Sequence, residues 1–382
     1  MRIVIVGGGL AAATAATELR DTGFEGEVAV FAAEPHEPYE RPPLSKAVLM
    51  GDKEPASVYC HDRQWYADND VDLHTGERVV AVDREARTIT TDSGATTSYD
   101  ALLLATGAQP RHLPDADAAG AVYLRTIDDS AQLKSRLNSG TRVIVIGGGW
   151  IGLEVTSAAR TAGAEVTVIE MADLPLQGVL GDEIAAVFAD LHREHDVDLR
   201  LGATITGFDR VGESVVVHTD GGDVEGDLLV VGIGVVPDSA LAEEAGLDVD
   251  NGVLVDATLR TSDEHIWAVG DLASHDHPIL GRLRVEHWDN AIEQAKVAAH
   301  NLAGGSETYD RAPYFFTDQY DLGMEYVGRA GRGDEVVTRG DVPGRVFQAY
   351  WLHDGLVSAA MQVNDWDSSG VIRAAVGKPF AG

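Results

Sequence analysis

The sequence has a single cysteine, few basic residues and no long apolar segment. Cys60 is the only cysteine among 382 residues, so the chain can form no internal disulfide and no cysteine-ligated iron–sulfur cluster. Any redox chemistry therefore needs a bound organic cofactor, and a reducing cytoplasm is the expected location. The longest uncharged stretch, residues 3–17, is too short to cross a bilayer and lacks the preceding charged region of a signal peptide.

The charge balance is strongly acidic. Acidic residues number 62 and basic residues 29, of which 24 are arginine, so the net charge is −33. Such a surface repels nucleic acid and anionic membranes, and we expect neither as a partner. It fits a salty cytoplasm, where screening keeps an acidic protein soluble, or a high-GC bacterium. The length predicts two or three domains, and 45% apolar with 24% charged residues is typical of a globular protein.

One sequence unit occurs twice, 140 residues apart. The copies are RIVIVGGGLAAATAATELRDTGFEGEVAVFAAE, residues 2–34, and RVIVIGGGWIGLEVTSAARTAGAEVTVIE, residues 142–170. Each opens with a β-branched run typical of a buried parallel strand, followed by a glycine cluster, a helix-length segment and a second strand ending in an acid. This order predicts two dinucleotide-binding units.

The small residues of each copy have separate physical roles. Gly7 permits the tight strand-to-helix turn, Gly9 leaves room for a pyrophosphate at the helix N-terminus, and Ala12 lets the helix pack close to the sheet. The corresponding residues of the second copy are Gly147, Gly149 and Gly152. The alternative is a glycine turn in an ordinary α/β protein. Because the whole unit of strand, glycine cluster, helix and terminal acid occurs twice, nucleotide binding is favoured over this alternative.

The terminal acids indicate which nucleotides bind. Glu34 and Glu170 follow the third small residue by 22 and 18 residues, where a carboxylate can accept hydrogen bonds from ribose hydroxyls. Two sites in one chain predict FAD and a nicotinamide nucleotide. Glu170 would repel a 2′-phosphate, and no arginine lies between Arg160 and Arg193, so NADH is favoured over NADPH. An arginine brought in by the fold could reverse this preference.

Further motifs resemble a known family. The strands ending in Ala-Thr-Gly and Gly-Asp resemble the two-dinucleotide-binding-domain flavoprotein fold of glutathione reductase; they are ALLLATGAQPR (101–111), LLVVGIGVVPD (228–238) and HIWAVGDLA (265–273). Four more segments are similar to NADH-dependent ferredoxin reductases that serve Rieske oxygenases and cytochromes P450: RPPLSK (41–46), YLRT (123–126), VEHWDNAIEQAKVAAHNL (285–302) and PYFFTDQYD (313–321).

The resemblance implies an α/β protein with two Rossmann-like domains and a small C-terminal α+β domain. The FAD domain is expected at 1–110 and 237–310, the NAD domain at 111–236 and the C-terminal domain at 311–382. Residues 346–363, VFQAYWLHDGLVSAAMQV, predict a hairpin there because Asp-Gly separates two apolar runs. Family members often continue further, so the chain is expected to be short at its C-terminus.

The resemblance also implies site residues. For FAD these are Glu34 on the adenosine ribose, Ala11 against the pyrophosphate, Arg125 near the flavin nucleotide and Asp271 on a ribityl hydroxyl. Asp271 could also cap the following helix, which is compatible with FAD contact because one carboxylate has lone pairs for both. The other expected FAD contacts are Gly7, Gly9, Ala12, Arg41, Lys46, Val79, Thr106, Gly107 and Arg111. The expected NAD contacts are Gly147, Gly149, Ile151, Gly152, Glu170 and Gly234.

Lys46 and Glu154 are the expected catalytic pair, acting by electrostatic support rather than as a general base. In the resembling fold, such a lysine meets such a glutamate beside flavin N5. The ammonium then favours the reduced flavin, which is negatively charged at N1 and O2. Read alone, Lys46 could be a solvated loop lysine and Glu154 an exposed helix residue.

Aromatic residues and histidines complete the candidates. Trp288 and Phe316 are expected to face the flavin ring, or else to be core aromatics, and many relatives have tryptophan at the position of Phe316. Cys60 is expected to be a buried or half-buried structural thiol. No metal site is predicted: the histidine clusters 192–195 and 275–277 lack further ligands and are interpreted as a solvated helix face and a loop.

The expected activity is NADH:ferredoxin reduction, with a small [2Fe–2S] or similar ferredoxin as partner and a monomer or homodimer as assembly. Ferredoxins are usually acidic, so docking needs screening or a local basic patch, for which the candidates are Arg311, Arg329, Arg332 and Arg339. These could also be plain surface arginines. The alternatives are an NADH oxidase or peroxide reductase, a rubredoxin- or nitrite-linked reductase, and an NADH-sensing flavoprotein.

Overall fold

The computed structural model describes residues 1–380, which divide into two compact units. The first unit comprises residues 1–41, 56–109 and 236–313. The second comprises residues 42–55, 110–235 and the chain from 314 onward. The chain passes from one unit to the other after residues 41, 55, 109, 235 and 313, and two of these crossings lie in β8 (Ala108–Pro110) and β16 (Val235–Pro237). Within residues 1–380, no helix combines the length and apolarity needed to span a membrane.

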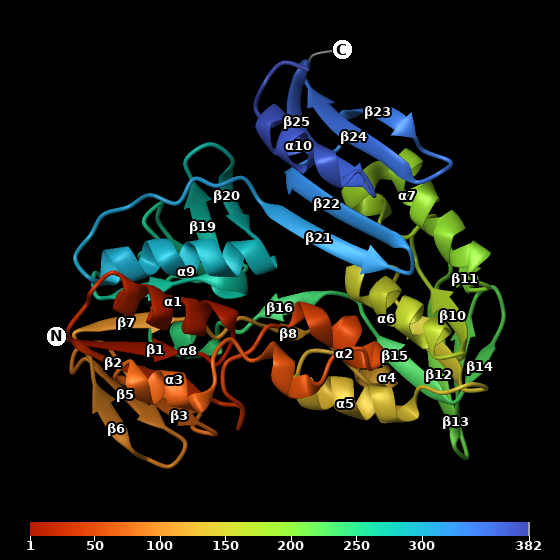
Figure 1. Ribbon diagram of the computed structural model, residues 1–382. Helices are drawn as coiled ribbons and strands as arrows, with labels where there is room; N and C mark the ends of the chain where they lie inside the picture. Colours follow the sequence, from red (N-terminus) through yellow and green to blue (C-terminus); the bar gives the residue numbers. More distant parts are fainter. Residues whose placement is uncertain (381–382) are drawn as a thin grey trace. The chain divides into compact units, whose positions relative to one another are not determined.

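A five-stranded parallel sheet forms the centre of the first unit (Figure 1). Its order is β18-β7-β1-β2-β3, and the bounds are Ile266–Ala268, Ala101–Leu104, Arg2–Val6, Glu27–Ala32 and Val71–Thr75. Apart from Arg2 and Glu27 at their first positions, the inner strands are apolar because both faces are covered. Helices α1 (Leu10–Asp21) and α9 (Trp288–Leu302) pack against each other, and the buried alanines of α1 allow this close approach.

Two smaller sheets and two short helices complete the first unit. The antiparallel sheet has the order β4-β5-β6 (Val79–Asp83, Thr88–Thr91, Thr96–Ser98), and the mixed sheet has the order β17-β19-β20 (Val253–Val255, Ala273–His277, Gly281–Arg284). The helices are α3 (Arg63–Asp68) and α8 (Ala240–Glu244).

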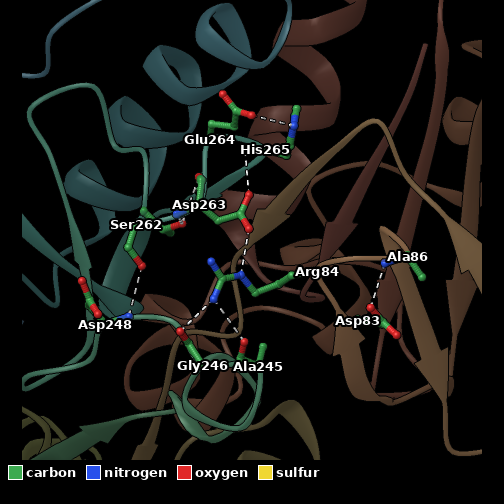
Figure 2. Close-up of polar contacts among 11 residues, drawn as sticks. Asp83, Arg84, Ala86, Ala245, Gly246, Asp248, Ser262, Asp263, Glu264 and His265 are labelled. Atoms are coloured by element: carbon green, nitrogen blue, oxygen red, sulfur yellow. Dashed lines mark hydrogen bonds and ion pairs between the residues drawn. The ribbon is translucent and has the colours of Figure 1, made fainter.

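Arg84 ties these parts of the first unit together, as Figure 2 shows. Its guanidinium donates to Asp263 Oδ2 and to the carbonyl of Gly246, both at 2.8 Å. Burial would raise the pKa of Asp263, but the bonds from Arg84 and from the His265 amide outweigh burial and hold this pKa below its usual value. The β4–β5 turn is thereby fixed to the end of α8 and to the loop before β18.

The second unit contains its own parallel sheet, of order β11-β10-β9-β15. The bounds are Asp198–Arg200, Glu165–Ile169, Arg142–Ile146 and Leu228–Val231. An antiparallel sheet of order β12-β13-β14 adjoins it (Ile205–Val211, Ser214–Thr219, Val224–Gly226). The helices are α2 (Ala47–Met50), α4 (Pro114–Ala118), α5 (Ile127–Arg136), α6 (Trp150–Thr161) and α7 (Gln177–Glu194).

The second unit also includes a five-stranded antiparallel sheet near the C-terminus. Its order is β21-β22-β25-β24-β23 (Tyr314–Gln319, Leu322–Gly328, Leu356–Val363, Val346–His353, Glu335–Asp341), followed by α10 (Ser369–Ala375). Its apolar face shares a core with α6 and α7, in which Phe188, Phe347 and Met361 are fully buried. The β24–β25 hairpin confirms the predicted one, and Asp354 and Gly355 adopt the positive φ of its turn.

The predicted fold class is confirmed, because two parallel sheets with glycine-led helices and a small antiparallel sheet are all present. The predicted division at 110/111, 236/237 and 310/311 stays a prediction. The compact units place residues 42–55 with the second parallel sheet, and they group this sheet with the C-terminal one.

Candidate functional site

The first glycine cluster forms an open cradle at the start of α1. Gly7 has φ +145°, and a Cβ there would lie 2.2 Å from the Ala105 carbonyl oxygen, so only glycine fits this turn. A Cβ on Gly9 would meet nothing within 4 Å, so the space in front of the helix N-terminus is free. Ala11 and Ala12 are buried behind it. Free space and backbone N–H groups at this place suit a pyrophosphate.

The second cluster repeats this geometry at the start of α6. Gly147 has φ +103°, and its Cβ would lie 2.4 Å from the Gly232 carbonyl oxygen. A Cβ on Gly152 would lie 2.1 Å from the Gly147 carbonyl oxygen, so the helix contacts the turn directly. Gly149 again faces open space, with its nearest neighbour at 3.9 Å. Ile151 is 44% exposed, and Gly234 has open space at its Cβ position.

A carboxylate is anchored behind each cradle. Glu34 accepts from the Tyr39 hydroxyl at 2.5 Å and from Arg41 at 2.9 Å. Glu170 accepts from the backbone N–H of Gly148 at 2.6 Å and of Ala172 at 2.8 Å. Each oxygen keeps a second lone pair, so both carboxylates can still accept from a ribose hydroxyl.

Arg41 lies between two predicted FAD contacts of the first unit. Burial opposes its charge, but Tyr39, Glu34 and Asp271 outweigh burial and raise the pKa of Arg41. Asp271 belongs to a single helical turn, Gly270–Leu272. The negative charge of Asp271 acts on both Arg41 and the half-buried His287, and it raises the pKa of each.

The second unit holds a buried ion pair between Lys46 and Glu154. Lys46 precedes α2, Glu154 lies on α6, and their Nζ and Oε1 atoms are 2.8 Å apart. The side chains are 12% and 4% exposed, so neither is a solvated surface residue. Ser45 donates to the other oxygen of Glu154, and Thr317 donates to Oε1 at 2.6 Å. The carboxylate is thus held by three donors.

Two further side chains lie around this ammonium. Lys46 Nζ is 5.6 Å from the centroid of the Phe316 ring, at cation–π distance. Asp318 follows on the same strand. Its desolvation raises the pKa of the Asp318 carboxyl; Lys46 opposes this shift and Glu154 adds to it. A cation between two carboxylates and an aromatic ring can place positive charge next to a bound ring system.

Comparison with known proteins agrees with this geometry. Residues 1–295 match the family of pyridine nucleotide-disulphide oxidoreductases, and residues 314–379 match the reductase C-terminal domain. The ferredoxin–NAD(+) reductase component of the anthranilate 1,2-dioxygenase system of Burkholderia cepacia is 42% identical over 367 residues, covering 94% of this chain and 90% of that protein. The chain belongs to the ferredoxin–NAD reductase family.

Solved structures of such reductases superpose on nearly the whole chain. The covalent putidaredoxin reductase–putidaredoxin complex gives a TM-score of 0.92 at 35% identity, covering 98% of this chain and 93% of that one. A ferredoxin reductase for the CYP199A2 system of Rhodopseudomonas palustris gives 0.94 at 36% identity, covering 100% and 96%. The family implies FAD and NADH as cofactors, and the open cradles at Gly9 and Gly149 fit two such dinucleotides.

The remaining predicted FAD contacts of the reductase differ in their burial and in their hydrogen-bond partners. In the first unit, Thr106 donates to the carbonyl of Asp238 at 2.7 Å, Gly107 has φ +74°, Trp288 donates to Glu40 at 3.3 Å, and Val79 packs against the core. In the second unit, Arg111 is exposed and Arg125 is half-buried before α5. Their contact with FAD stays a prediction.

Sequence reasoning missed several residues of these sites. Tyr39, Ser45 and Thr317 donate to the predicted carboxylates, and each lies within two residues of a predicted contact, so adjacency was the available signal. The expected solvated helix face was wrong: His192 is fully buried and His195 is half-buried. The expected solvated loop was also wrong, because His275 and His277 are buried in β19. Helix α7 and strand β19 turn these side chains toward packed neighbours, which a short polar cluster does not reveal.

Two other candidate groups have clear surroundings. Arg311 pairs with Asp289 at 3.1 Å and Glu293 at 3.5 Å, so its charge is largely neutralised. Arg339 lies over the rings of Tyr350 and Phe380, and Arg329 and Arg332 are exposed. Within residues 1–380, no group of three or more His, Cys, Asp or Glu side chains is placed to hold a metal ion.

Proposed function

We propose that this reductase transfers electrons from NADH through FAD to a small iron–sulfur ferredoxin that serves an oxygenase. One observation carries the proposal: a single chain has two open glycine cradles, each backed by an anchored carboxylate. Two nucleotides held by one protein favour transfer between them. When bound, FAD supplies the redox chemistry by accepting a hydride and releasing electrons singly.

The state of Cys60 supports an external electron acceptor. It is the only cysteine, so no thiol pair can take electrons within the chain. It is half-buried, and burial, with a smaller contribution from Glu40, raises the pKa of the thiol to about 12. A thiol that keeps its proton at neutral pH is a poor nucleophile. This disfavours a peroxide-reducing activity based on Cys60 and leaves a separate carrier protein as the acceptor.

Residues of the second unit have separate roles in hydride transfer: some bind NADH and others act electrostatically. Glu170 holds the adenosine ribose of NADH, while the N-terminus of α6 holds its pyrophosphate. Lys46 supplies positive charge to the bound ring, and Glu154 keeps the ammonium in one position. No side chain need remove a proton for a hydride to transfer. The two residues therefore act electrostatically.

The same geometry supports NADH over NADPH. Both oxygens of Glu170 are held by backbone N–H groups, so the carboxylate cannot swing away from a 2′-phosphate. The fixed carboxylate of Glu170 at the ribose end would repel the additional phosphate of NADPH.

Ferredoxin docking requires exposed basic residues, because ferredoxins are usually acidic. Arg329 and Arg332 are exposed between β22 and β23, and neither forms an ion pair within the described residues. We propose these two, rather than Arg311, as contacts for an acidic ferredoxin. A [2Fe–2S] cluster in the partner, a monomeric or dimeric assembly and a cytoplasmic location stay predictions.

The test is NADH oxidation by the purified yellow protein, with and without a [2Fe–2S] ferredoxin and cytochrome c. NADPH serves as the nucleotide control, and the series is repeated at high salt. A large ferredoxin-dependent increase with NADH is expected, and the Cys60→Ser variant should match the parent. Bleaching by NADH without a ferredoxin effect would reject ferredoxin as the acceptor. Loss of activity in Cys60→Ser would instead favour thiol chemistry.

A further inference from the structure

Four polar side chains of the second unit are buried in a row that leads away from Lys46. Glu154 on α6 is 4% exposed, Thr317 on β21 is 1% exposed, and Gln319 on β21 and His192 on α7 are fully buried. Thr317 and Gln319 are two residues apart on one strand, so they share a face. Burying polar groups is costly unless each is hydrogen-bonded. Here each one bonds to the next.

The row begins at a hydrogen bond with only one possible direction. Glu154 pairs with Lys46, so its carboxylate accepts and Thr317 must donate to it, at 2.6 Å. A threonine hydroxyl has a single proton. Having given that proton to Glu154, Thr317 can only accept from its other neighbour.

Gln319 continues the row in the same direction. Its amide nitrogen donates to Thr317 Oγ1 at 3.3 Å, which leaves its carbonyl oxygen facing His192 Nε2 at 2.9 Å. An oxygen in that place needs a donor. If His192 offered an acceptor instead, the amide would turn over and present its oxygen to Thr317. The hydroxyl proton of Thr317 would then have two competing acceptors, Gln319 and Glu154.

His192 is held in the form that provides this donor. Burial lowers the pKa of His192 to about 4; Gln319 opposes this shift and His195 adds to it, so the ring is neutral and has one N–H at neutral pH. The Tyr320 hydroxyl lies 3.3 Å from Nδ1. Burial raises the pKa of Tyr320, so the hydroxyl keeps its proton and can donate, which leaves the N–H of His192 on Nε2. Ser157 fixes Tyr320 by accepting from its backbone N–H at 2.9 Å.

We propose that His192 is a positioning residue of the reductase: through Gln319 and Thr317 it directs a third hydrogen bond onto Glu154 and so sets the negative charge beside Lys46. This inference rests on the proposed function, in which Lys46 and Glu154 support bound FAD. Without the bond from Thr317, the charge of Glu154 is less compensated. A more negative field disfavours the reduced flavin, which carries the added electrons.

The test is the midpoint potential of the bound FAD in single and double variants. His192→Leu and Thr317→Val should each lower the ratio of reduced to oxidised FAD about tenfold at a fixed solution potential, which is about 30 mV for a two-electron couple. His192→Gln and Thr317→Ser retain an N–H or O–H donor and should recover most of the loss. The double variant His192→Leu/Thr317→Val should equal Thr317→Val alone, because His192 acts only through the Thr317–Glu154 bond that Thr317→Val already removes.

A matched control separates positioning from stability. Gln362→Leu also removes a fully buried amide of the C-terminal sheet, one that donates to Glu325 and not to Glu154. It should lower the thermal midpoint without moving the potential. An unchanged potential in His192→Leu, or additive shifts in the double variant, would overturn the inference. A protein that binds no FAD, or is not bleached by NADH, would instead reject the proposed function.

Discussion

Two buried histidines and one half-buried histidine should make this reductase sensitive to mild acid. Burial lowers the pKa of His192, His275 and His287 to about 4 in the folded protein, against about 6.5 in an unfolded chain. The unfolded state therefore binds more protons between these two values. The contribution of each histidine to stability is complete above pH 6.5 and is lost as the pH falls toward 4.

The size of the effect follows from the two pKa values. Lowering the pH from 7.5 to 5.5 should reduce the free energy of unfolding by about 1.3 kcal/mol for each histidine, or about 4 kcal/mol for the three together. This is a large part of the total stability of a typical protein. His218 works in the opposite direction, because Asp223 and Asp209 raise its pKa, but it is a single half-buried group.

Urea unfolding at several pH values, with FAD in constant excess, measures this loss. His275→Gln removes one titrating group that is not itself an expected cofactor contact, and it should reduce the loss between pH 7.5 and 5.5 by about a third. The matched control is His353→Gln, which changes an exposed histidine. A loss below about 1 kcal/mol, or an equal effect of the two variants, would refute the reasoning.

The remaining predictions concern the two nucleotide sites and the contacts of Arg84 within the first unit. Lys46→Met should slow bleaching by NADH at least about tenfold with little change in NADH affinity, which stopped-flow traces at several NADH concentrations would separate. Glu170→Asn should raise KM for NADH about tenfold and narrow its advantage over NADPH; an unchanged ratio in steady-state assays would count against the role of Glu170. Arg84→Met should cost about 2 kcal/mol of unfolding free energy at pH 7. Because the folded pKa of Asp263 lies below its usual value, this cost should begin to shrink only below about pH 4 and be lost as the pH falls through the folded pKa; thermal unfolding at pH 7 and at several pH values below about 4 checks it.

Much of the fold could be predicted from the sequence, because the local conformational preferences of these segments agree with the tertiary structure. The repeated glycine units predicted both parallel sheets and both cradles, since the positive φ of Gly7 and Gly147 and the close contacts around them admit no side chain. The β24–β25 hairpin was likewise predicted, because Asp354 and Gly355 readily adopt the turn conformation. The histidines were misread because burial depends on which elements pack together. A spacing of three or four residues does not show whether that helix face meets solvent or a sheet.

The sequence by itself determined the chemistry that is possible: two nucleotide cradles, one lone thiol and a lysine and a glutamate in motifs of a ferredoxin reductase family. Only the tertiary structure decided how these groups are supported. Glu154 and Thr317 are 163 residues apart, and His192 and Gln319 are 127 residues apart, yet all four lie in one hydrogen-bonded row. The physical reason is that a hydrogen bond depends on distances of about 3 Å between particular atoms. Such distances between remote segments arise only when α6, α7 and β21 pack together.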